Sequence, residues 1–364
     1  MPTPRYSTAT SARRRATPVP GRRFPAEWEA HAATWIAWPH HEPDWPGKLE
    51  AIHWVYAEIA RVLAAHERVE ILCHDDAVRS RARQCLTAHG VTDNVRLHVV
   101  PTDRVWLRDS APTTVMRPDG SIELVNWQFT AWAKYDNFAR DRAVGAAIQK
   151  ITGLPRVQAL RPDGAPLVLE GGAIDTDGRG TLLVTEECLL SDVQARNPGL
   201  TRADYERAFS DWLGIRKTIW LGEGCVGDDT HGHVDDIARF AAHDVVVLAY
   251  EDDPSDENHR RSADNLKRLQ AAGGRRGDFT IIRMPYPRPV MMDGQRLPAS
   301  YVNFYIGNGV VLVPTFNDVN DRVALNILTE VFPDHQVVGI HAVDLVWGLG
   351  TLHCLTQQQV AARK

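Results

Sequence analysis

The segment Thr34-Trp35-Ile36-Ala37-Trp38 begins the pattern that decides the fold. It is short, apolar and rich in side chains that favour strands. Residues 48–66 follow, and their apolar side chains recur every three or four positions from Ile52 to Leu63, which predicts an amphipathic helix. The next segment, Val69-Glu70-Ile71-Leu72-Cys73, predicts a second strand. This part of the chain therefore has the order strand, helix, strand.

The same order is repeated four more times along the chain. Thr201 with Asp204 three residues later predicts a capped helix start, and Gly153 and Gly214 stand where two of the helices should end. Because stacked repeats bury one another's apolar faces, five such units favour a closed, pseudo-symmetric α/β arrangement. The alternative is a plain open α/β sheet. The four further units are predicted over residues 123–160, 181–221, 245–282 and 310–340.

Residues that could carry chemistry lie in the connectors between the predicted units. In a closed ring, equivalent connectors converge near the axis, so side chains that are far apart in the sequence can share one pocket. The connectors contain Trp106-Leu107-Arg108-Asp109, Glu170-Gly171-Gly172, His231-Gly232-His233-Val234-Asp235-Asp236, and His353-Cys354.

The composition indicates an ordinary globular chain. Of its 364 residues, 44% are apolar and 24% are charged, which allows a sizeable core, and the net charge of -5 gives no general attraction to nucleic acid. The sequence contains no run of about eighteen apolar residues, which a membrane-spanning helix would require. The five cysteines are scattered and odd in number, which argues against a disulfide framework and for a reducing cytoplasm.

The first residues differ in composition from the rest. Residues 1–20 are rich in Ser, Thr, Pro and Arg, and they lack the apolar stretch that a secretory signal requires. We therefore expect a disordered extension over residues 1–22, followed by a single catalytic domain over residues 23–364.

Cys354 is the strongest candidate for a catalytic nucleophile. A lone thiol is more often an inert buried residue, but Gly348, Gly350 and Thr351 precede this one and a polar run follows it. Such a segment predicts a loop that brings backbone close to a ligand. A thiolate attacks an electrophilic carbon when a neighbouring base or cation activates it, and His233 is the predicted partner.

Three acids indicate the charge of the ligand. Asp109, Glu170 and Asp235 would make a strongly negative pocket, which is stable only when a cation fills it or some carboxyls are protonated. A planar guanidinium offers N–H donors that match carboxylates in pairs, and it contains an electrophilic carbon. The pattern therefore predicts a hydrolase that acts on a guanidinium compound.

These motifs, in this order, resemble a known family. They are similar to the successive motifs of the agmatine deiminase and Porphyromonas-type peptidylarginine deiminase family, within the guanidine-modifying (pentein) superfamily. The resemblance covers nearly the whole chain from about Phe24. It is carried by Pro25-Ala26-Glu27-Trp28-Glu29, Trp106-Leu107-Arg108-Asp109-Ser110-Ala111-Pro112, Leu169-Glu170-Gly171-Gly172, Thr230-His231-Gly232-His233-Val234-Asp235 and His353-Cys354-Leu355-Thr356-Gln357.

The resemblance implies a fold and a set of roles. The fold would be a fivefold pseudo-symmetric α/β propeller of ββαβ-like units. Cys354 would attack the guanidinium carbon to give a covalent thiouronium, and His233 would protonate the departing ammonia and then activate water. Asp109 and Asp235 would hold the guanidinium nitrogens, and Glu170 would orient His233 or share in holding the charge. The implied substrate-binding residues are Trp106, Asp229, Gly171 and Gly172.

Three departures from the family pattern bear on the substrate. Asp103-Arg104 stand where the family commonly has Asn-Asp, and Asp236 stands where it often has Asn. The segment before the nucleophile reads Gly348-Leu349-Gly350-Thr351-Leu352 rather than Gly-Gly-Gly-Asn-Ile. The favoured substrate is agmatine, which would give N-carbamoylputrescine for polyamine synthesis. The alternatives are peptidylarginine and another small guanidine.

Two other classes of function compete with this interpretation. His231, His233 and Asp235 alternate as in some metal-dependent hydrolases, although that class leaves the Cys354 loop unexplained. An acidic pocket could also belong to a non-enzymatic protein that binds cationic ligands. The favoured interpretation requires no cofactor and no metal. It takes a small guanidinium compound as partner, rather than nucleic acid or a membrane, and leaves homo-oligomer formation open.

Overall fold

The computed structural model of the chain describes residues 20–274 and 278–362. The extension expected over residues 1–22 lies almost wholly outside these residues. Arg22, at its end, is buried and forms an ion pair with Glu123, so this arginine belongs to the folded part of the chain.

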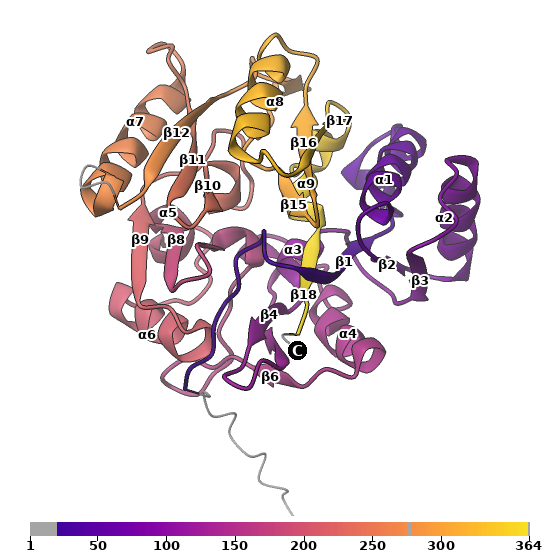
Figure 1. Cartoon of the computed structure of the whole chain (residues 1–364), viewed down its shortest axis with the longest axis horizontal. Helices are drawn as coiled ribbons and strands as arrows, with labels where there is room; N and C mark the ends of the chain where they lie inside the picture. The colour runs from indigo at the N-terminus through magenta and orange to yellow at the C-terminus, as the bar shows by residue number, and fades with distance from the viewer. Residues whose placement is uncertain (1–19, 275–277, 363–364) are drawn as a thin grey trace, which may run out of the picture.

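A three-stranded sheet with one crossover helix is the repeated unit of the structure (Figure 1). In four sheets the first two strands pair antiparallel, and the third pairs parallel with the second after a helix. The second and third strands match the predicted strand, helix, strand units. The sheets are β4 (Thr113–Met116), β5 (Ile122–Asn126) and β6 (Arg156–Gln158); β7 (Asp175–Thr176), β8 (Thr181–Thr185) and β9 (Lys217–Leu221); β10 (Ala238–Ala242), β11 (Val245–Tyr250) and β12 (Thr280–Pro285); and β15 (Tyr305–Gly307), β16 (Val310–Thr315) and β17 (Gln336–His341).

The remaining large sheet joins segments that are far apart in the sequence. Its strand order is β18 (Gln357–Val360), β1 (His31–Ala37), β2 (Val69–Cys73) and β3 (Val95–Val99). β1 pairs antiparallel with β18 and parallel with β2, so the same unit is completed by a strand from the far end of the described chain. Helix α2 (Asp76–Ala88) and β3 extend this sheet and have no counterpart in the predicted pattern.

The crossover helices lie on the outer side of the molecule (Figure 1). The side chain of Thr201 accepts a hydrogen bond from the Asp204 N–H in the capping box that the sequence predicts. Gly153 and Gly214 follow two of the helices with φ values of 71° and 73°, which only glycine adopts without strain. The helices are α1 (Leu49–Ala64), α4 (Val144–Thr152), α6 (Arg202–Leu213), α7 (Glu257–Leu269) and α8 (Asn320–Val331).

Short turns fill the connectors, and α3 and α9 lie near the middle of the molecule (Figure 1). Four of them stand directly before the leading strand of a sheet: α3 (Leu107–Ser110), η4 (Gly171–Ala173), η5 (Val234–Asp236) and α9 (Leu352–Leu355). The other short elements are α5 (Glu186–Leu190), the hairpin β13 (Met291–Met292) and β14 (Gln295–Arg296), and the turns η1 (Glu42–Asp44), η2 (Ala131–Ala133), η3 (Asp141–Ala143), η6 (Gln270–Gly274) and η7 (Leu345–Gly348).

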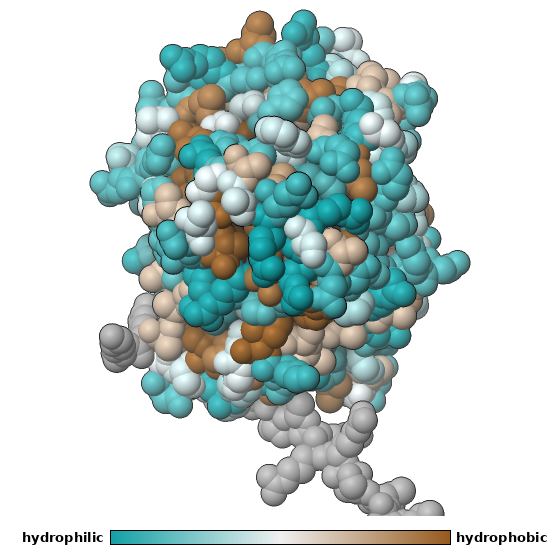
Figure 2. Space-filling model, turned by 90° about the vertical axis from the view of Figure 1, so that its right-hand side faces the viewer, coloured by the Kyte–Doolittle hydropathy of each residue, from teal (hydrophilic) through white to brown (hydrophobic). Residues whose placement is uncertain are grey.

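The result is a mixed α/β fold, and the strands of the described residues form no closed barrel. Trp35, Trp38 and Trp45 are buried in the largest apolar core, which continues from the first unit to the connectors. The face over α1 and α2 is mainly hydrophilic, with small separate apolar patches (Figure 2). Among the helices of residues 20–274 and 278–362, none combines the length and apolar character that a membrane crossing requires.

Candidate active site

Four connectors between the sheets meet at one place. α3 packs against α9 and against η4, and η4 packs against η5. Each connector is a single turn that ends where a leading strand begins, so the strand fixes its position. Side chains from distant parts of the sequence are thereby held next to one another, as the repeated units predict.

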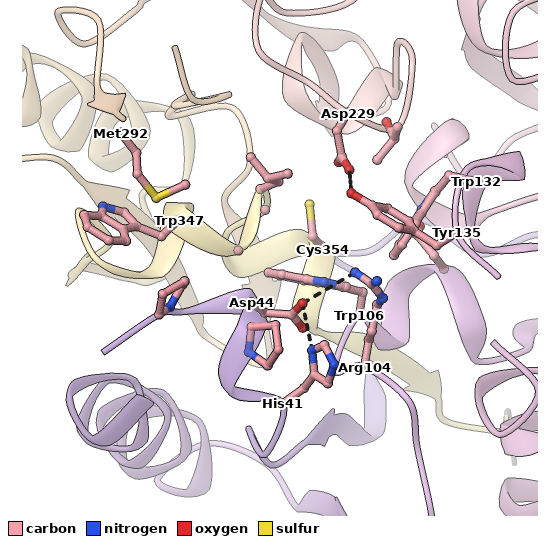
Figure 3. Close-up of a pocket in the computed structure, with 17 residues that line it drawn as sticks. His41, Asp44, Arg104, Trp106, Trp132, Tyr135, Asp229, Met292, Trp347 and Cys354 are labelled. Carbon is pink, nitrogen blue, oxygen red and sulfur yellow. Dashed lines mark hydrogen bonds and ion pairs between the residues drawn. The ribbon is translucent and has the colours of Figure 1, made fainter. Parts of the chain in front are cut away.

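A cavity of about 300 Å³ opens where the connectors meet (Figure 3). Four of the predicted site residues line this cavity, and Asp229 does so at the side opposite Asp44; the other three are Cys354, Asp109 and Trp106. Glu170, His233 and Asp235 do not line it but are buried in the connectors around it. The cavity is lined further by His41, Pro43, Asp44, Pro46, Arg104, Trp132, Tyr135, Thr230, Met292, Trp347, Gly348, Leu349 and Gly350.

Cys354 lies on α9, and its thiol points into the cavity (Figure 3). Asn303 Nδ2 donates a hydrogen bond to the sulfur at 3.1 Å. Asn303 Oδ1 accepts hydrogen bonds from the Thr351 hydroxyl at 2.7 Å and from the His353 backbone N–H at 3.0 Å. This asparagine precedes β15, so it comes from the fifth connector, and it holds both the α9 turn and the Cys354 thiol.

The loop before Cys354 packs closely on an aromatic ring. A Cβ atom at Gly350 would lie 2.9 Å from the ring of Trp106 and 3.1 Å from the Cβ of Cys354. Trp106 in turn packs at 5.8 Å, centroid to centroid, against Trp45. Glycine is therefore needed at this position for Trp106 to form one wall of the cavity beside the thiol.

Asp235 is fully buried beside Cys354. Its Oδ2 lies 2.6 Å from His353 Nδ1 and 3.8 Å from Cys354 Sγ. Its other oxygen, Oδ1, is buried and accepts no hydrogen bond from the described residues. A buried acceptor without a donor costs free energy, so a hydrogen-bond donor placed beside this oxygen would be favourable.

His233 is held between two carboxylates. Its Nδ1 lies 3.9 Å from Asp109 Oδ1, and its Nε2 lies 3.7 Å from Glu170 Oε2 without making a hydrogen bond. Glu170 is anchored by Arg196, whose Nε donates to both carboxylate oxygens at 3.2 and 3.3 Å. Glu170 can therefore orient His233 while remaining charged itself.

Asp109 is fixed by two donors from different connectors. The Gly172 N–H donates to Oδ1 and the Trp132 indole N–H donates to Oδ2, both at 2.9 Å. A Cβ atom at Gly172 would lie 2.4 Å from His233 Nδ1, so a larger residue would displace the histidine. Gly171 packs on the Arg108 backbone, and neither glycine lines the cavity. Both glycines thus support the site residues from behind.

The turn that carries Trp132 has an unusual backbone. Ala131, Trp132 and Ala133 have φ values of 47°, 58° and 52°, so three successive non-glycine residues are left-handed. This conformation costs roughly 1 to 2 kcal/mol per residue. Gln194 Nε2 holds the turn by donating to the Trp132 carbonyl at 3.0 Å. This strained turn brings the Trp132 indole into hydrogen-bonding contact with Asp109. It also brings Tyr135 to the cavity wall.

Two further acids line the cavity, on opposite sides of Cys354 in the view of Figure 3. Asp229 Oδ2 accepts hydrogen bonds from the Tyr135 hydroxyl at 2.7 Å and from Lys134 Nζ at 3.3 Å. Asp44 Oδ1 faces His41 at 3.1 Å and Arg104 at 3.5 Å, while its Oδ2 accepts no hydrogen bond from the described residues. The mouth of the cavity thus combines two carboxylates with cations that already neutralise part of their charge.

The charges within the site oppose one another. Burial raises the pKa of Asp109 to about 6, against the attraction of His233. Burial and then the neighbouring acids Asp235, Asp236 and Asp109 raise the pKa of the Cys354 thiol well above its usual value. Burial lowers the pKa of His233, but the charge of Asp109 and contacts with Cys188 and Glu170 outweigh it and raise that pKa well above its usual value. A bound cation would reverse the effect of the carboxylates on the thiol.

Asp236 stands where the family that the sequence resembles often has asparagine, and its surroundings explain how aspartic acid fits there. Burial and then the charges of Asp235 and Asp228 raise the pKa of Asp236 well above its usual value, which favours the neutral acid. Its Oδ1 accepts a hydrogen bond from Asn303 Nδ2 at 2.9 Å. A neutral carboxyl offers one acceptor oxygen and one donor, as an asparagine amide does. The site therefore tolerates aspartic acid where asparagine is common.

The alternating segment His231, His233 and Asp235 does not form a common metal site. His231 Nε2 lies 3.0 Å from Ser191 Oγ, whereas His233 faces Glu170 and Asp235 faces His353. In the described part of the chain, the groups whose ligand atoms approach one another are Glu170 with Cys188 and His233, and Asp235 with Asp236 and Cys354. The three side chains of the predicted metal segment therefore diverge.

This combination of fold and site is that of one protein family. The chain belongs to the family described as Porphyromonas-type peptidyl-arginine deiminase, whose family model matches residues 23–359. It is 36% identical to the agmatine deiminase of Pseudomonas aeruginosa (strain LESB58), over 94% of this chain and 97% of that protein. It is also similar to the solved structure of agmatine deiminase of Enterococcus faecalis, with a TM-score of 0.84 and 29% identity over 93% of this chain and 96% of the other. An amidinotransferase from Microseira wollei shares the fold alone, with a TM-score of 0.53 and 13% identity over 93% and 96% of the two chains.

Sequence analysis missed three residues that contact the predicted ones. Asn303 binds the thiol, Trp132 binds Asp109, and Arg196 binds Glu170. The signal for Asn303 was available, because five repeated units require a fifth connector and this residue lies in it. Trp132 and Arg196 stand within loops that carry no motif.

Proposed function

We propose that the chain hydrolyses agmatine through Cys354, releasing ammonia and forming N-carbamoylputrescine without a cofactor. The observation that carries the proposal is a thiol that shares one cavity with Asp109 and lies 3.8 Å from Asp235, whose Oδ1 has no hydrogen-bond donor among the described residues. A guanidinium group would supply the missing donor and neutralise both carboxylates. The relative named agmatine deiminase, at 36% identity over most of the chain, supports this substrate.

In the proposed reaction, the bound guanidinium lowers the cost of ionising Cys354, and the thiol proton leaves the site. The thiolate sulfur then bonds to the guanidinium carbon. His233 gives its proton to one amino group, the C–N bond breaks, and ammonia leaves a thiouronium on the sulfur. Neutral His233 next takes a proton from water, the hydroxide adds to the same carbon, and the C–S bond breaks. The oxygen loses its remaining proton, which leaves a neutral ureido product and a free thiolate.

The other site residues have supporting roles in this proposal. Asp109 and Asp235 hold the guanidinium nitrogens, and Glu170 orients His233. Trp106 forms a wall of the substrate channel. Gly171 and Gly172 allow the connectors to approach closely enough for these contacts, rather than binding the substrate themselves.

The mouth of the cavity favours a substrate with a second positive charge. An ammonium group at the far end of agmatine would donate to the free Oδ2 of Asp44 and would compete with Lys134 for Asp229. Guanidinobutyrate would instead bring a carboxylate to these two acids, and in free arginine a carboxylate accompanies the α-ammonium group and offsets its charge. Peptidylarginine is the second candidate, because a peptide carries no charge of its own at this point.

A cationic alkylating reagent tests the electrostatics of the thiol. Chloroacetamidine should label Cys354 at least about 100-fold faster than the neutral iodoacetamide, after correction for their reactivity with a free thiol, because its charge offsets the surrounding carboxylates. Peptide mass spectrometry should find the label on Cys354 and not on Cys73, Cys85, Cys188 or Cys225, and agmatine should protect it. Even labelling of all five thiols would count against a preformed cation site.

We also propose that the five sheets form a fivefold pseudo-symmetric propeller of ββαβ units, and that residues 23–364 form one catalytic domain. The repeated strand order and the meeting of the connectors support this arrangement. The five cysteines are free thiols, which is consistent with the cytoplasmic location that the sequence predicts.

Ammonia release from a small set of guanidines tests the proposed function. Agmatine should give the highest kcat/KM, at least about 100-fold above arginine and guanidinobutyrate, because their carboxylates face like charges at the mouth. The same assay with a blocked peptidylarginine decides between the two candidate substrates, since faster turnover of the peptide would reassign the function. Activity that survives a chelator but not a thiol alkylator would exclude a metal-dependent hydrolase. If none of the four compounds released ammonia, the protein would not be a guanidine hydrolase at this site.

A further inference from the structure

A buried chain of hydrogen bonds joins Asp235 to a residue near the start of the described chain. His353 Nδ1 lies 2.6 Å from Asp235 Oδ2, and His353 Nε2 lies 2.8 Å from Glu27 Oε2. All three side chains are buried, with His353 only 1% exposed. The proposed reaction uses Asp235 but gives no role to His353 or Glu27.

The hydrogen bonds of Glu27 show which form of its carboxyl is present. Oε1 accepts from Arg239 Nη2 at 2.8 Å and from the Ile306 backbone N–H at 2.9 Å. Oε2 accepts from Arg108 Nη2 at 3.0 Å and faces His353 Nε2. Burial would raise the pKa of Glu27, but the charges of Arg239, His353 and Arg108 hold that pKa well below its usual value. Glu27 is therefore a carboxylate, and His353 Nε2 must carry a hydrogen.

The charges around His353 indicate whether its second ring nitrogen, Nδ1, also carries a hydrogen. The ion pairs that connect directly to His353 or to its partners Glu27 and Arg239 join three carboxylates, Glu27, Asp175 and Asp235, to two arginines, Arg108 and Arg239. A third positive charge balances the cluster if His353 also carries a hydrogen on Nδ1 and donates it to Asp235. Buried charges are tolerated when they are paired and hydrogen-bonded in this way.

We propose that His353 is a positioning residue, held as an imidazolium between Glu27 and Asp235, which keeps Asp235 charged and leaves its Oδ1 free for a bound guanidinium group. The inference rests on the proposed function, because it takes Asp235 as the partner of the substrate cation. It adds that the charge of Asp235 is maintained by residues that touch neither the substrate nor the thiol.

The surroundings of Asp235 make its charge depend on His353. Burial by itself would raise the pKa of Asp235, but the hydrogen bond and the positive charge of His353 are the strongest opposing effects and bring that pKa below its usual value. The other charged or titratable groups that face it are the cations His233 and Arg239 and the acids or thiol of Asp109, Asp236 and Cys354. Without His353, burial and the neighbouring acids would favour the protonated form of Asp235.

Two variants separate the charge of His353 from its hydrogen bond. His353→Gln removes the positive charge and one of the two hydrogen bonds. Glu27→Gln presents an amide N–H to Nε2, so the ring must give up its hydrogen there, yet it can still donate from Nδ1 to Asp235. Both variants should raise the pKa of Asp235 until its protonation, rather than that of Asp109, sets the acid limb of kcat/KM, which moves that limb upward by about one pH unit or more. At neutral pH, kcat/KM should fall about 10-fold or more, with most of the loss in KM and recovery as the pH rises.

His31→Gln is the matched control. His31 is also buried, with Nδ1 3.3 Å from Glu67 and Nε2 2.7 Å from the Glu27 backbone carbonyl, but it does not contact Asp235. Its loss should lower the melting temperature while leaving the acid limb in place. If His353→Gln and Glu27→Gln behaved like His31→Gln, with the limb unmoved, the role of His353 would be structural only and the inference would be wrong.

The rate of Cys354 labelling by chloroacetamidine provides a readout that does not depend on the substrate. If the unmodified protein released no ammonia from agmatine, the proposed function would fail. The pH dependence of labelling would then still test His353, because binding of the amidinium needs the charge of Asp235. An upward shift of that pH dependence in both variants would support the inference, and an unchanged one would overturn it.

Discussion

Replacing Cys354 with serine should abolish turnover, reducing kcat by about a thousandfold or more, because a hydroxyl is far less acidic than a thiol and forms no comparable nucleophile. The fold should persist, since serine is similar in size and Asn303 Nδ2 can donate to its oxygen as it does to the sulfur. The measurement is ammonia release under saturating agmatine, with circular dichroism to confirm folding.

Cys73→Ser is the control for this experiment. Cys73 is buried at the end of β2, and burial raises the pKa of its thiol to about 12, so it is an unreactive thiol of similar exposure. This variant should lose some stability but keep its turnover. Near-normal activity of Cys354→Ser would remove Cys354 as the nucleophile.

Asp109→Asn and Asp235→Asn should each reduce kcat/KM by about 30- to 800-fold. Each change removes one charged hydrogen-bond partner of the guanidinium, which corresponds to roughly 2 to 4 kcal/mol in transition-state binding. Glu42→Gln is a suitable control, because Glu42 is an exposed acid in η1 that does not line the cavity. A loss below threefold in both aspartate variants would contradict the assignment of the guanidinium partners.

The same variants should change the pH dependence in different ways. With the pKa of Asp109 raised to about 6, its carboxyl becomes protonated below that pH and can no longer pair with the cation. The kcat/KM of the unmodified protein should therefore fall as the pH drops through about 6. Asp109→Asn should lose this limb. Asp235→Asn should move it to lower pH, because Asp235 is one of the charges that raise the pKa of Asp109.

The repeated strand and helix units were predictable because they are local and periodic. The capping box at Thr201 and the glycines after α4 and α6 set helix ends by short-range chemistry alone. The leading strands are harder to predict, since β7 has two residues and β15 has three, too few to show alternation. Helix α2 is rich in arginine and buries only three side chains, so its apolar face is weak in the sequence.

The residues of the site also fall into those that the sequence could predict and those that it could not. Cys354, His233, Asp109, Asp235 and Glu170 could be predicted because each lies in a short motif next to a unit boundary. Trp132 reaches Asp109 only because three successive residues are left-handed. Alanine and tryptophan rarely adopt this conformation, so the sequence does not predict it. The contact between Glu27 and His353 joins positions 326 residues apart, and nothing local to either segment indicates it.

The pairing of β1 with β18 also affects how the protein is made. A ribosome adding about 5 to 20 residues per second would finish His353 on the order of 20 to 60 s after Glu27. Throughout that interval, the edge of β1 that later receives β18 has open N–H and C=O groups, which can template pairing with other chains. A nascent chain is therefore catalytically silent and prone to aggregation until its final described strand emerges, so we expect its yield in cells to depend on chaperones that shield this edge.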